Sequence, residues 1–178
     1  EISVEPTGVD LETFADGDGP AFRRKLGVDA GALLLAYVGR IAPEKNVAFL
    51  AAAVAEALAR LDRAHFVAIG AGPAEGDMVD ALEARGAADR AHFAGVCEGA
   101  ELVDAYHAAD AFVFASKTET QGVVLVEAMA AGCPVVALDA PGVREVVRDG
   151  ENGYLLDRED PRAFAELIER LADLDAGA

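Results

Sequence analysis

Short, continuous runs of apolar residues alternate along the chain with segments in which apolar residues recur every three or four positions. A continuous apolar run of strand length is typical of a strand that is covered on both faces of a sheet. The predicted strands are Ala32–Val38, His65–Ile69, Ala91–Ala94, Ala111–Ala115, Pro134–Leu138 and Gly153–Leu155.

The segments between these runs have the periodicity of helices that are apolar on one side. In the first of them, Leu50, Val54 and Leu58 follow one another at the spacing of one helical turn. Gly86 and Gly132 stand where two of the helices are expected to stop. The predicted helices are Val47–Leu61, Glu75–Arg85, Glu101–His107, Val123–Ala131, Val143–Arg148 and Pro161–Leu171.

Regular alternation of strands and helices predicts an α/β fold, a Rossmann-like, doubly wound parallel sheet with helices on both faces. We expect the whole chain, 1–178, to form one domain with its core in residues 30–178. Residues 1–29 are interrupted by Pro and Gly and predict a strand, a loop and a short helix around Phe22–Leu26. Ligands of such sheets bind at the carboxyl ends of the strands, so the loops after the strands are the candidate sites.

Composition narrows the class of function. The net charge of −17 argues against a nucleic-acid partner, which requires a basic face, but leaves room for a phosphorylated small molecule bound by local amides and cations. No apolar run is long enough for a membrane span, and no signal peptide is visible, so we expect a cytoplasmic protein. Cys97 and Cys133 match no metal or redox spacing and are expected to be reduced core thiols.

The loop Gly39–Asn46 contains two cations near the start of a helix, with Asn46 as a plausible N-cap. Arg40 and Lys45 could converge on one anion, such as a diphosphate, because Arg offers a fork of donors and Lys a compact charge. The alternative interpretation is that both are surface residues paired with Glu44.

Two glycine-containing loops follow the next strands. Gly70–Pro73 is favoured as a tight strand-to-helix turn, with close approach of a ligand to the backbone as the alternative. Gly95–Gly99 could support a planar base against Val96 while exposed main-chain groups bond to it.

The segment from Ser116 into the helix beyond it is the most informative. Gly122 stands where the helix begins, so the amides of residues 122, 123 and 124 are expected to be free donors that bind phosphate. Glu119 precedes this helix, and Glu127 lies inside it among apolar neighbours. A Glu in such a helix requires a partner or a ligand, and two carboxylates near a diphosphate are best explained by hydroxyl groups that they bind.

These residues resemble the family 4 retaining glycosyltransferases, which have the GT-B fold, over nearly the whole chain. Four segments match that family's C-terminal domain in order. They are Glu5–Asp10 with Phe14, which is similar to its interdomain segment; Val38–Asn46, similar to its phosphate loop; Glu119 and Glu127, its two-glutamate motif; and Gly150–Leu155, its short turn and strand.

The resemblance implies a donor site for a UDP-sugar or a GDP-sugar, with retention at the anomeric carbon and no required metal or other cofactor. It implies that Arg40 and Lys45 bind the diphosphate, that Glu119 contacts the transferred sugar and that Glu127 binds the ribose; Arg40, Lys45 and Glu119 are the expected catalytic residues. Gly39, Val96, Gly122, Val123 and Val124 complete the predicted donor site.

The family often has Glu-Gly-Phe-Gly where this chain has Glu119-Thr120-Gln121-Gly122. That variant resembles members that glycosylate lipids, so the acceptor could be a lipid or a glycan. The family's acceptor site lies in an N-terminal domain, and we expect that domain to be the missing partner of this chain and the only route to a membrane contact. The isolated chain is therefore predicted to bind nucleotide weakly and to transfer nothing.

Three alternatives remain at this stage. Half of a nucleotide-sugar epimerase would share the architecture, and a degenerate donor domain would bind nucleotide without catalysis. A flavodoxin-like or receiver-like regulatory domain would require clustered acidic residues at the strand ends, which are not evident. His65, His92 and His107 are scattered along the chain and are predicted to be structural.

Overall fold

Six parallel strands form a single sheet in the order β3-β2-β1-β4-β5-β6. The structure, a computed structural model, describes residues 8–175, so Glu5–Thr7 of the predicted interdomain motif lie outside the described residues. The strands are β1 (Leu33–Val38), β2 (Ala64–Ile69), β3 (Ala91–Gly95), β4 (Ala111–Phe114), β5 (Val135–Leu138) and β6 (Gly153–Leu156). β1, β4 and β5 lie inside the sheet and are almost wholly buried, as their unbroken apolar runs predict.

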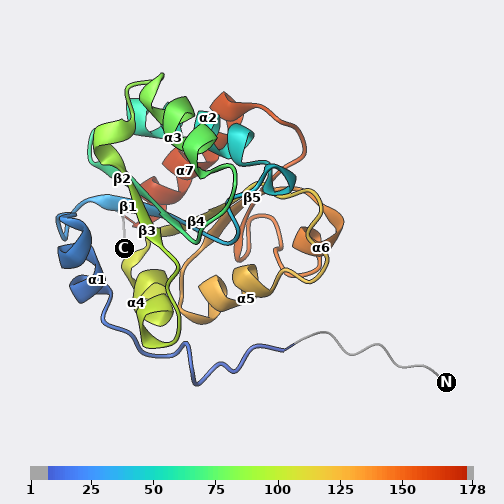
Figure 1. Ribbon diagram of the computed structural model, residues 1–178. Coiled ribbons are helices and arrows are strands. Elements are labelled where there is room, and N and C mark those ends of the chain that lie inside the picture. Colours follow the sequence, from blue (N-terminus) through green and yellow to red (C-terminus); the bar gives the residue numbers. More distant parts are fainter. Residues whose placement is uncertain (1–7, 176–178) are drawn as a thin grey trace.

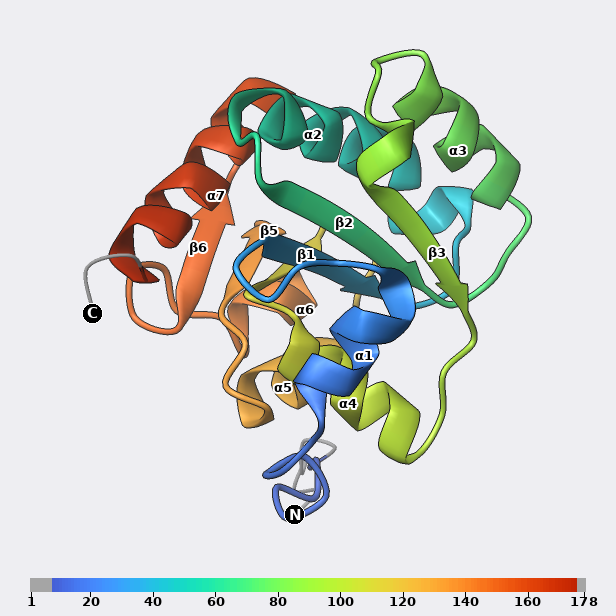
Figure 2. The same cartoon turned by 90° about the vertical axis from the view of Figure 1, so that its left-hand side faces the viewer.

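Helices cover both faces of this sheet, as the alternating pattern predicts (Figures 1 and 2). On one face α2 packs against both α3 and α7, and on the other face α1 packs against α4, with α5 beside them. The helices are α1 (Gly19–Leu26), α2 (Val47–Arg60), α3 (Glu75–Glu83), α4 (Ala100–Ala108), α5 (Val123–Ala130), α6 (Pro141–Arg144) and α7 (Pro161–Asp175).

The helix predicted at Val143–Arg148 is shorter and lies earlier in the chain. It begins at Pro141, whose fixed φ suits the first helical position, and ends at Arg144. Beyond it the side chain of Asn152 accepts a hydrogen bond from the Arg148 amide and donates one to the Val146 carbonyl. These backbone groups therefore have partners other than a continued helix.

The predicted helix stops are confirmed, because Gly86 and Gly132 adopt left-handed φ values of 71° and 78° just beyond α3 and α5. The short helix expected around Phe22–Leu26 begins earlier, at Gly19. Asp18 caps it by accepting a hydrogen bond from the Ala21 amide at 2.8 Å.

The order of the strands reverses between β1 and β4, which are adjacent although β2 and β3 lie between them in the sequence. In doubly wound sheets this switch point is where the loops on either side diverge and leave a crevice at the carboxyl ends of the strands. The loops that follow β1 and β4 are the two with the predicted cations and glutamates, so the topology brings them to the same place.

The glycines after β2 let the loop after β1 approach closely. A Cβ on Gly70 would lie 2.0 Å from the carbonyl oxygen of Gly39, and one on Gly72 would lie 2.2 Å from that of Ile41. The Ile41 amide donates to the Ala71 carbonyl at 3.1 Å and joins the two loops. The close neighbour of this backbone is thus the predicted phosphate loop, a contact that the sequence alone does not reveal.

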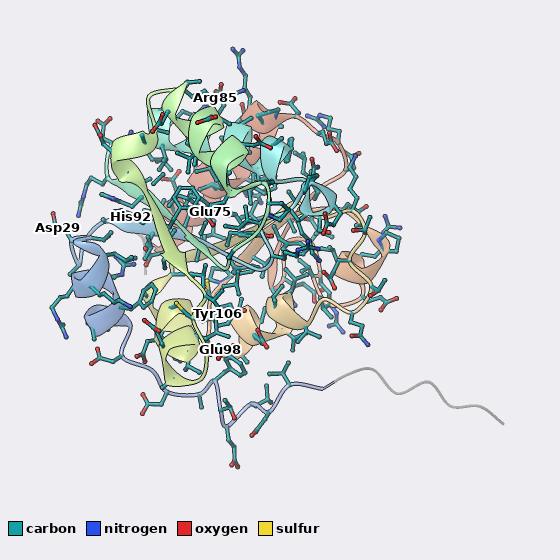
Figure 3. All side chains as sticks on the ribbon, viewed as in Figure 1. Asp29, Glu75, Arg85, His92, Glu98 and Tyr106 are labelled. Atoms are coloured by element: carbon teal, nitrogen blue, oxygen red, sulfur yellow. The ribbon has the colours of Figure 1, made fainter. Side chains whose placement is uncertain are left out.

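Two of the three histidines meet on neighbouring strands. His65 on β2 and His92 on β3 stack with ring centroids 5.4 Å apart, and Nδ1 of His65 lies 3.1 Å from Nε2 of His92. Burial lowers the pKa of both; Arg90 lowers that of His65 further, and His65 that of His92. Figure 3 shows His92 on β3, at the edge of the sheet.

This pair predicts a loss of stability in mild acid. Because both pKa values are lower in the folded protein, the unfolded chain binds more protons below about pH 6.5, and the free energy of unfolding falls as the pH falls through that region. Urea unfolding at about pH 7.5, 6.5 and 5.5 measures the effect. We expect His92→Gln to make the free energy of unfolding less dependent on pH; equal slopes for wild type and His92→Gln would contradict the expectation.

Candidate functional site

A buried tyrosine stabilises the loop after β1 through a hydrogen bond. Tyr37 is completely buried, and its hydroxyl donates to the carbonyl oxygen of Arg40 at 2.9 Å. Burial raises the pKa of Tyr37 well above its usual range, aided by the charges of Glu44 and Glu119, so the hydroxyl remains a donor. Gly39 has a φ of 148°, and a Cβ there would lie 3.1 Å from this hydroxyl, which explains the glycine.

Asn46 stands at the N-cap position of α2, as predicted, but its side chain does not cap the helix. It has a left-handed φ of 56°, and its amide nitrogen donates to Glu159 at 3.0 Å. A short 3-10 turn, Pro43–Lys45, precedes it, with the Lys45 amide bonded to the Ala42 carbonyl at 2.9 Å. The turn gives Lys45 a fixed starting point at the base of α2.

The two cations of this loop have different partners in the structure. Arg40 pairs with Glu44 at 3.1 Å and is 64% exposed, which is the alternative considered for it. Lys45 instead reaches across to the loop after β4, where its Nζ lies 3.2 Å from Oε2 of Glu119. This pair is only partly exposed, 26% for Lys45 and 15% for Glu119.

Glu119 is fixed by the backbone around it. Its Oε1 accepts from the amides of Thr120, Gln121 and Gly122 at 3.1–3.3 Å, while Oε2 faces Lys45. Burial alone raises the pKa of this carboxyl, but these bonds outweigh it and the pKa is lowered, so Glu119 is ionised at neutral pH.

One predicted donor is therefore occupied. The Gly122 amide was expected to be free, yet Glu119 lies three residues before it and folds back onto it as a helix-start acceptor would. Gly122 is the N-cap residue of α5, as its predicted place at the helix start implies, with φ 62°. The amides of Val123 and Val124 lie in the first turn, where the helix itself provides no acceptor.

Two further contacts join the loops after β1 and β4. The Thr118 hydroxyl donates to the carbonyl of Glu44 at 3.2 Å. Glu159, between β6 and α7, accepts from Asn46 of one loop and pairs with Lys117 of the other. The candidate diphosphate site is thus one connected unit, although its loops are far apart in sequence.

Gly142 on α6 also supports this unit, and sequence reasoning missed it. A Cβ there would lie 2.4 Å from the carbonyl oxygen of Glu119, so only glycine lets α6 pack against the loop. The Pro-Gly pair at 141–142 was the available signal in the sequence.

Glu127 has the partner that its apolar surroundings require. Its Oε2 accepts a hydrogen bond of 2.7 Å from the hydroxyl of Tyr106 on α4, a residue that the sequence analysis did not single out. The expectation that Glu127 requires a partner or a ligand is therefore confirmed for the partner.

A cavity of about 260 Å³ lies at the carboxyl ends of β1, β2 and β3, beside Arg40. Val96, 64% exposed, and the buried thiol Cys97 line it, as do Gly39 and Gly70. Another cavity, of about 370 Å³, lies at the opposite edge of the sheet near Gly132 and Gly150, away from the residues with candidate chemistry. Both cysteines are buried thiols outside any disulfide, as predicted.

Within residues 8–175, no group of three or more His, Cys, Asp or Glu side chains is arranged to hold a metal ion. Within the same range, no helix combines the length and apolarity that crossing a bilayer requires. The strand order differs from the 2-1-3-4-5 order of flavodoxin-like and receiver-like sheets, which excludes that alternative.

The strand order is that of sheets that bind nucleotides at the switch point, and the joined loops with their amides and cations lie at that point. These features define the chain as an α/β domain of the Rossmann-like class. Residues 18–176 match the family model described as glycosyl transferases group 1, so the chain belongs to that family.

Two curated relatives share one name with each other. The chain is 38% identical over 174 residues to a D-inositol 3-phosphate glycosyltransferase of Geodermatophilus obscurus, covering 93% of this chain and 39% of the relative. It is 39% identical over 179 residues to the enzyme of that name from Frankia alni, covering 96% of this chain and 44% of the relative. The chain thus spans about two fifths of the length of these relatives.

Solved structures agree on the fold. HepE of Anabaena in complex with UDP matches with a TM-score of 0.82 at 28% identity, covering 93% of this chain and 46% of HepE. The C-terminal domain of the glycosyl transferase group 1 family protein LpcC from Francisella tularensis matches with a TM-score of 0.81 at 26% identity, covering 93% of this chain and 88% of that domain. The fold is therefore that of the C-terminal domain of GT-B glycosyltransferases.

Proposed function

We propose that this chain is the donor-binding domain of a retaining, family 4 glycosyltransferase that takes its sugar from a UDP-sugar. The observation that carries the proposal is the Lys45–Glu119 pair, which brings a cation and a partly buried carboxylate together at the switch point of the sheet. UDP is favoured over GDP because the HepE structure and the pneumococcal transferase GtfA, 28% identical to this chain, are both described as complexes with UDP.

The diphosphate would lie beside Lys45, Arg40 and the first turn of α5. Lys45 carries three donors and uses one on Glu119, so the others can meet phosphate oxygens. Arg40 is exposed, so its guanidinium can leave Glu44 and bind a phosphate group through two parallel hydrogen bonds. As the sugar–phosphate bond breaks, these cations would stabilise the negative charge that grows on the leaving diphosphate, in the role that a metal has in other transferases.

The two glutamates would hold hydroxyl groups. In this proposal Glu119, which is fixed just before α5, binds hydroxyls of the transferred sugar, and Glu127, about one turn inside α5, binds the ribose. The base would enter the cavity beside Val96, where backbone groups and an apolar side chain are exposed. The acceptor site is assigned to a second domain of the whole protein, so the chain alone would bind nucleotide and transfer no sugar.

Calorimetric titration with UDP and with GDP, each with and without Mg²⁺, tests the proposal. We expect UDP to bind without the metal and more tightly than GDP, and Arg40→Ala and Glu127→Ala each to weaken it about five- to thirty-fold. Arg148→Ala, which removes an exposed cation paired with Glu151, is the matched control and should leave the affinity unchanged. Failure of the folded chain to bind either nucleotide would contradict the donor site.

A further inference from the structure

The hydrogen bond between Tyr106 and Glu127 joins a buried hydroxyl to a carboxylate at the candidate site. Tyr106 is completely buried, and its hydroxyl lies 2.7 Å from Oε2 of Glu127, which is itself only half-buried. Figure 3 shows Tyr106 on α4, and Figures 1 and 2 show α4 and α5 next to each other under the sheet. The bond therefore crosses between two helices of the same layer.

In this hydrogen bond Tyr106 is the donor and Glu127 the acceptor. Burial raises the pKa of Tyr106 far above its usual range, and the charge of Glu127 raises it further, so the hydroxyl keeps its proton and donates it. A carboxylate has about four acceptor positions, and this bond uses one of them. Glu127 thus retains acceptor positions for a ligand.

The ring of Tyr106 is held from two sides. Phe14, in the segment before α1, contacts it edge-on with centroids 5.8 Å apart, and Phe112 of β4 lies at the same distance on another side. All three rings are buried. Because the ring cannot turn without displacing two aromatic neighbours, the hydroxyl is a rigid support for the carboxylate.

We infer that Tyr106 is a positioning residue: it holds Glu127 in the one orientation in which this carboxylate accepts hydrogen bonds from the ribose hydroxyls of the donor. The inference rests on the proposed function for the identity of the ligand. The competing explanation is that Glu127 only satisfies a buried tyrosine, in which case the bond matters for folding and not for the ligand.

Removing the hydroxyl separates these explanations. We expect Tyr106→Phe to weaken UDP binding about three- to ten-fold while the affinity for 2′,3′-dideoxy-UDP, which lacks the ribose hydroxyls, stays the same. Glu127→Gln should likewise weaken the binding of UDP and leave the binding of the analogue unchanged. Tyr154→Phe is the matched control, since it removes the hydroxyl of another buried tyrosine, on β6 beneath Arg170.

Each other outcome overturns the inference. Equal weakening of both ligands by Tyr106→Phe would mean a structural role, and unchanged UDP binding would mean that the hydroxyl does not orient Glu127. If the wild-type domain binds UDP and the analogue equally well, the proposed ribose contact is refuted, whereas the proposed diphosphate site is not.

A measurement without nucleotide keeps this test independent of the proposed function. The side-chain carboxyl ¹³C resonance of Glu127, assigned by its loss in Glu127→Gln, should shift and broaden in Tyr106→Phe and stay in place in Tyr154→Phe. If UDP does not bind but this resonance responds, the donor proposal fails and the positioning stands. An unmoved resonance in Tyr106→Phe contradicts the positioning whatever the nucleotide does.

Discussion

Replacing Gly70 by alanine is expected to destabilise the domain by about 3 kcal/mol or more. The residue has a φ of 135°, which L-residues rarely adopt, and an added Cβ would lie 2.0 Å from the carbonyl oxygen of Gly39. Neither atom can yield cheaply, because the Gly39 amide is bonded to the end of β2 and the Gly70 amide to the end of β3. Urea unfolding followed by circular dichroism measures the loss, and the displaced Gly39 should weaken UDP binding as well.

Gly76→Ala is the matched control. Gly76 lies in α3, where a Cβ would meet nothing within 4 Å and φ is in the ordinary range. Alanine is a better helix former, so this variant should gain about 0.5–1 kcal/mol. A Gly70→Ala protein that unfolds within 1 kcal/mol of the wild type would mean that the close packing of these two loops is not required.

Lys45→Met is expected to lower the affinity for UDP about ten- to one-hundred-fold, the largest change that a single side chain of the proposed site should produce. The substitution keeps the length of the side chain and removes its charge, so the diphosphate loses its nearest partly buried cation. Glu119 keeps its three backbone amides, and the free energy of unfolding should change by about 1 kcal/mol or less.

The control for charge is Arg60→Met. Arg60 lies at the other end of α2 and pairs with Glu166 and Glu169 of α7, so its loss changes the net charge equally without touching the loops at the switch point. Calorimetric titration of both variants compares them directly. Similar losses of affinity in the two would attribute the effect to overall charge and would contradict a specific role for Lys45.

The architecture could be predicted because the fold leaves a local trace in the sequence. A parallel sheet covered by helices on both faces buries its strands completely, so β1, β4 and β5 appear as unbroken apolar runs. The helices between them must bury one side only, which gives the three-to-four spacing of Leu50, Val54 and Leu58 in α2. The helix ends were harder to predict, as at α6, where Asn152 provides the competing hydrogen bonds.

For the candidate site too, the sequence indicated some features and not others. The sequence placed Lys45 and Glu119 in loops after strands, where parallel sheets bind ligands, and Glu127 inside the helix that follows the second loop. It did not indicate Gly142, since a contact of 2.4 Å between a helix and a distant loop leaves no periodic pattern. It also gave no sign that the Gly122 amide would be occupied by Glu119, because that depends on the rotamer of one side chain.

Arg23 shows how far local pattern can mislead. In the sequence it is one of several basic residues in a short helix, a position typical of the surface. In the structure Arg23 is only 8% exposed. Its guanidinium donates hydrogen bonds to the carbonyls of Ala32 and Ala108 and to the carboxylate of Asp110. Five fixed donors allow this burial, but only the docking of α1 against α4, near the starts of β1 and β4, provides the acceptors.

The sequence by itself therefore determined the strands, the helices, the family and the positions of the charged groups, since each of these depends on residues close together in the chain. The tertiary structure decided which groups meet. Lys45 faces Glu119 and Tyr106 supports Glu127 only because the strand order puts β1 beside β4 and lays α4 next to α5. Such contacts depend on the order and register of the strands, and neither is encoded in the periodicity of any one segment.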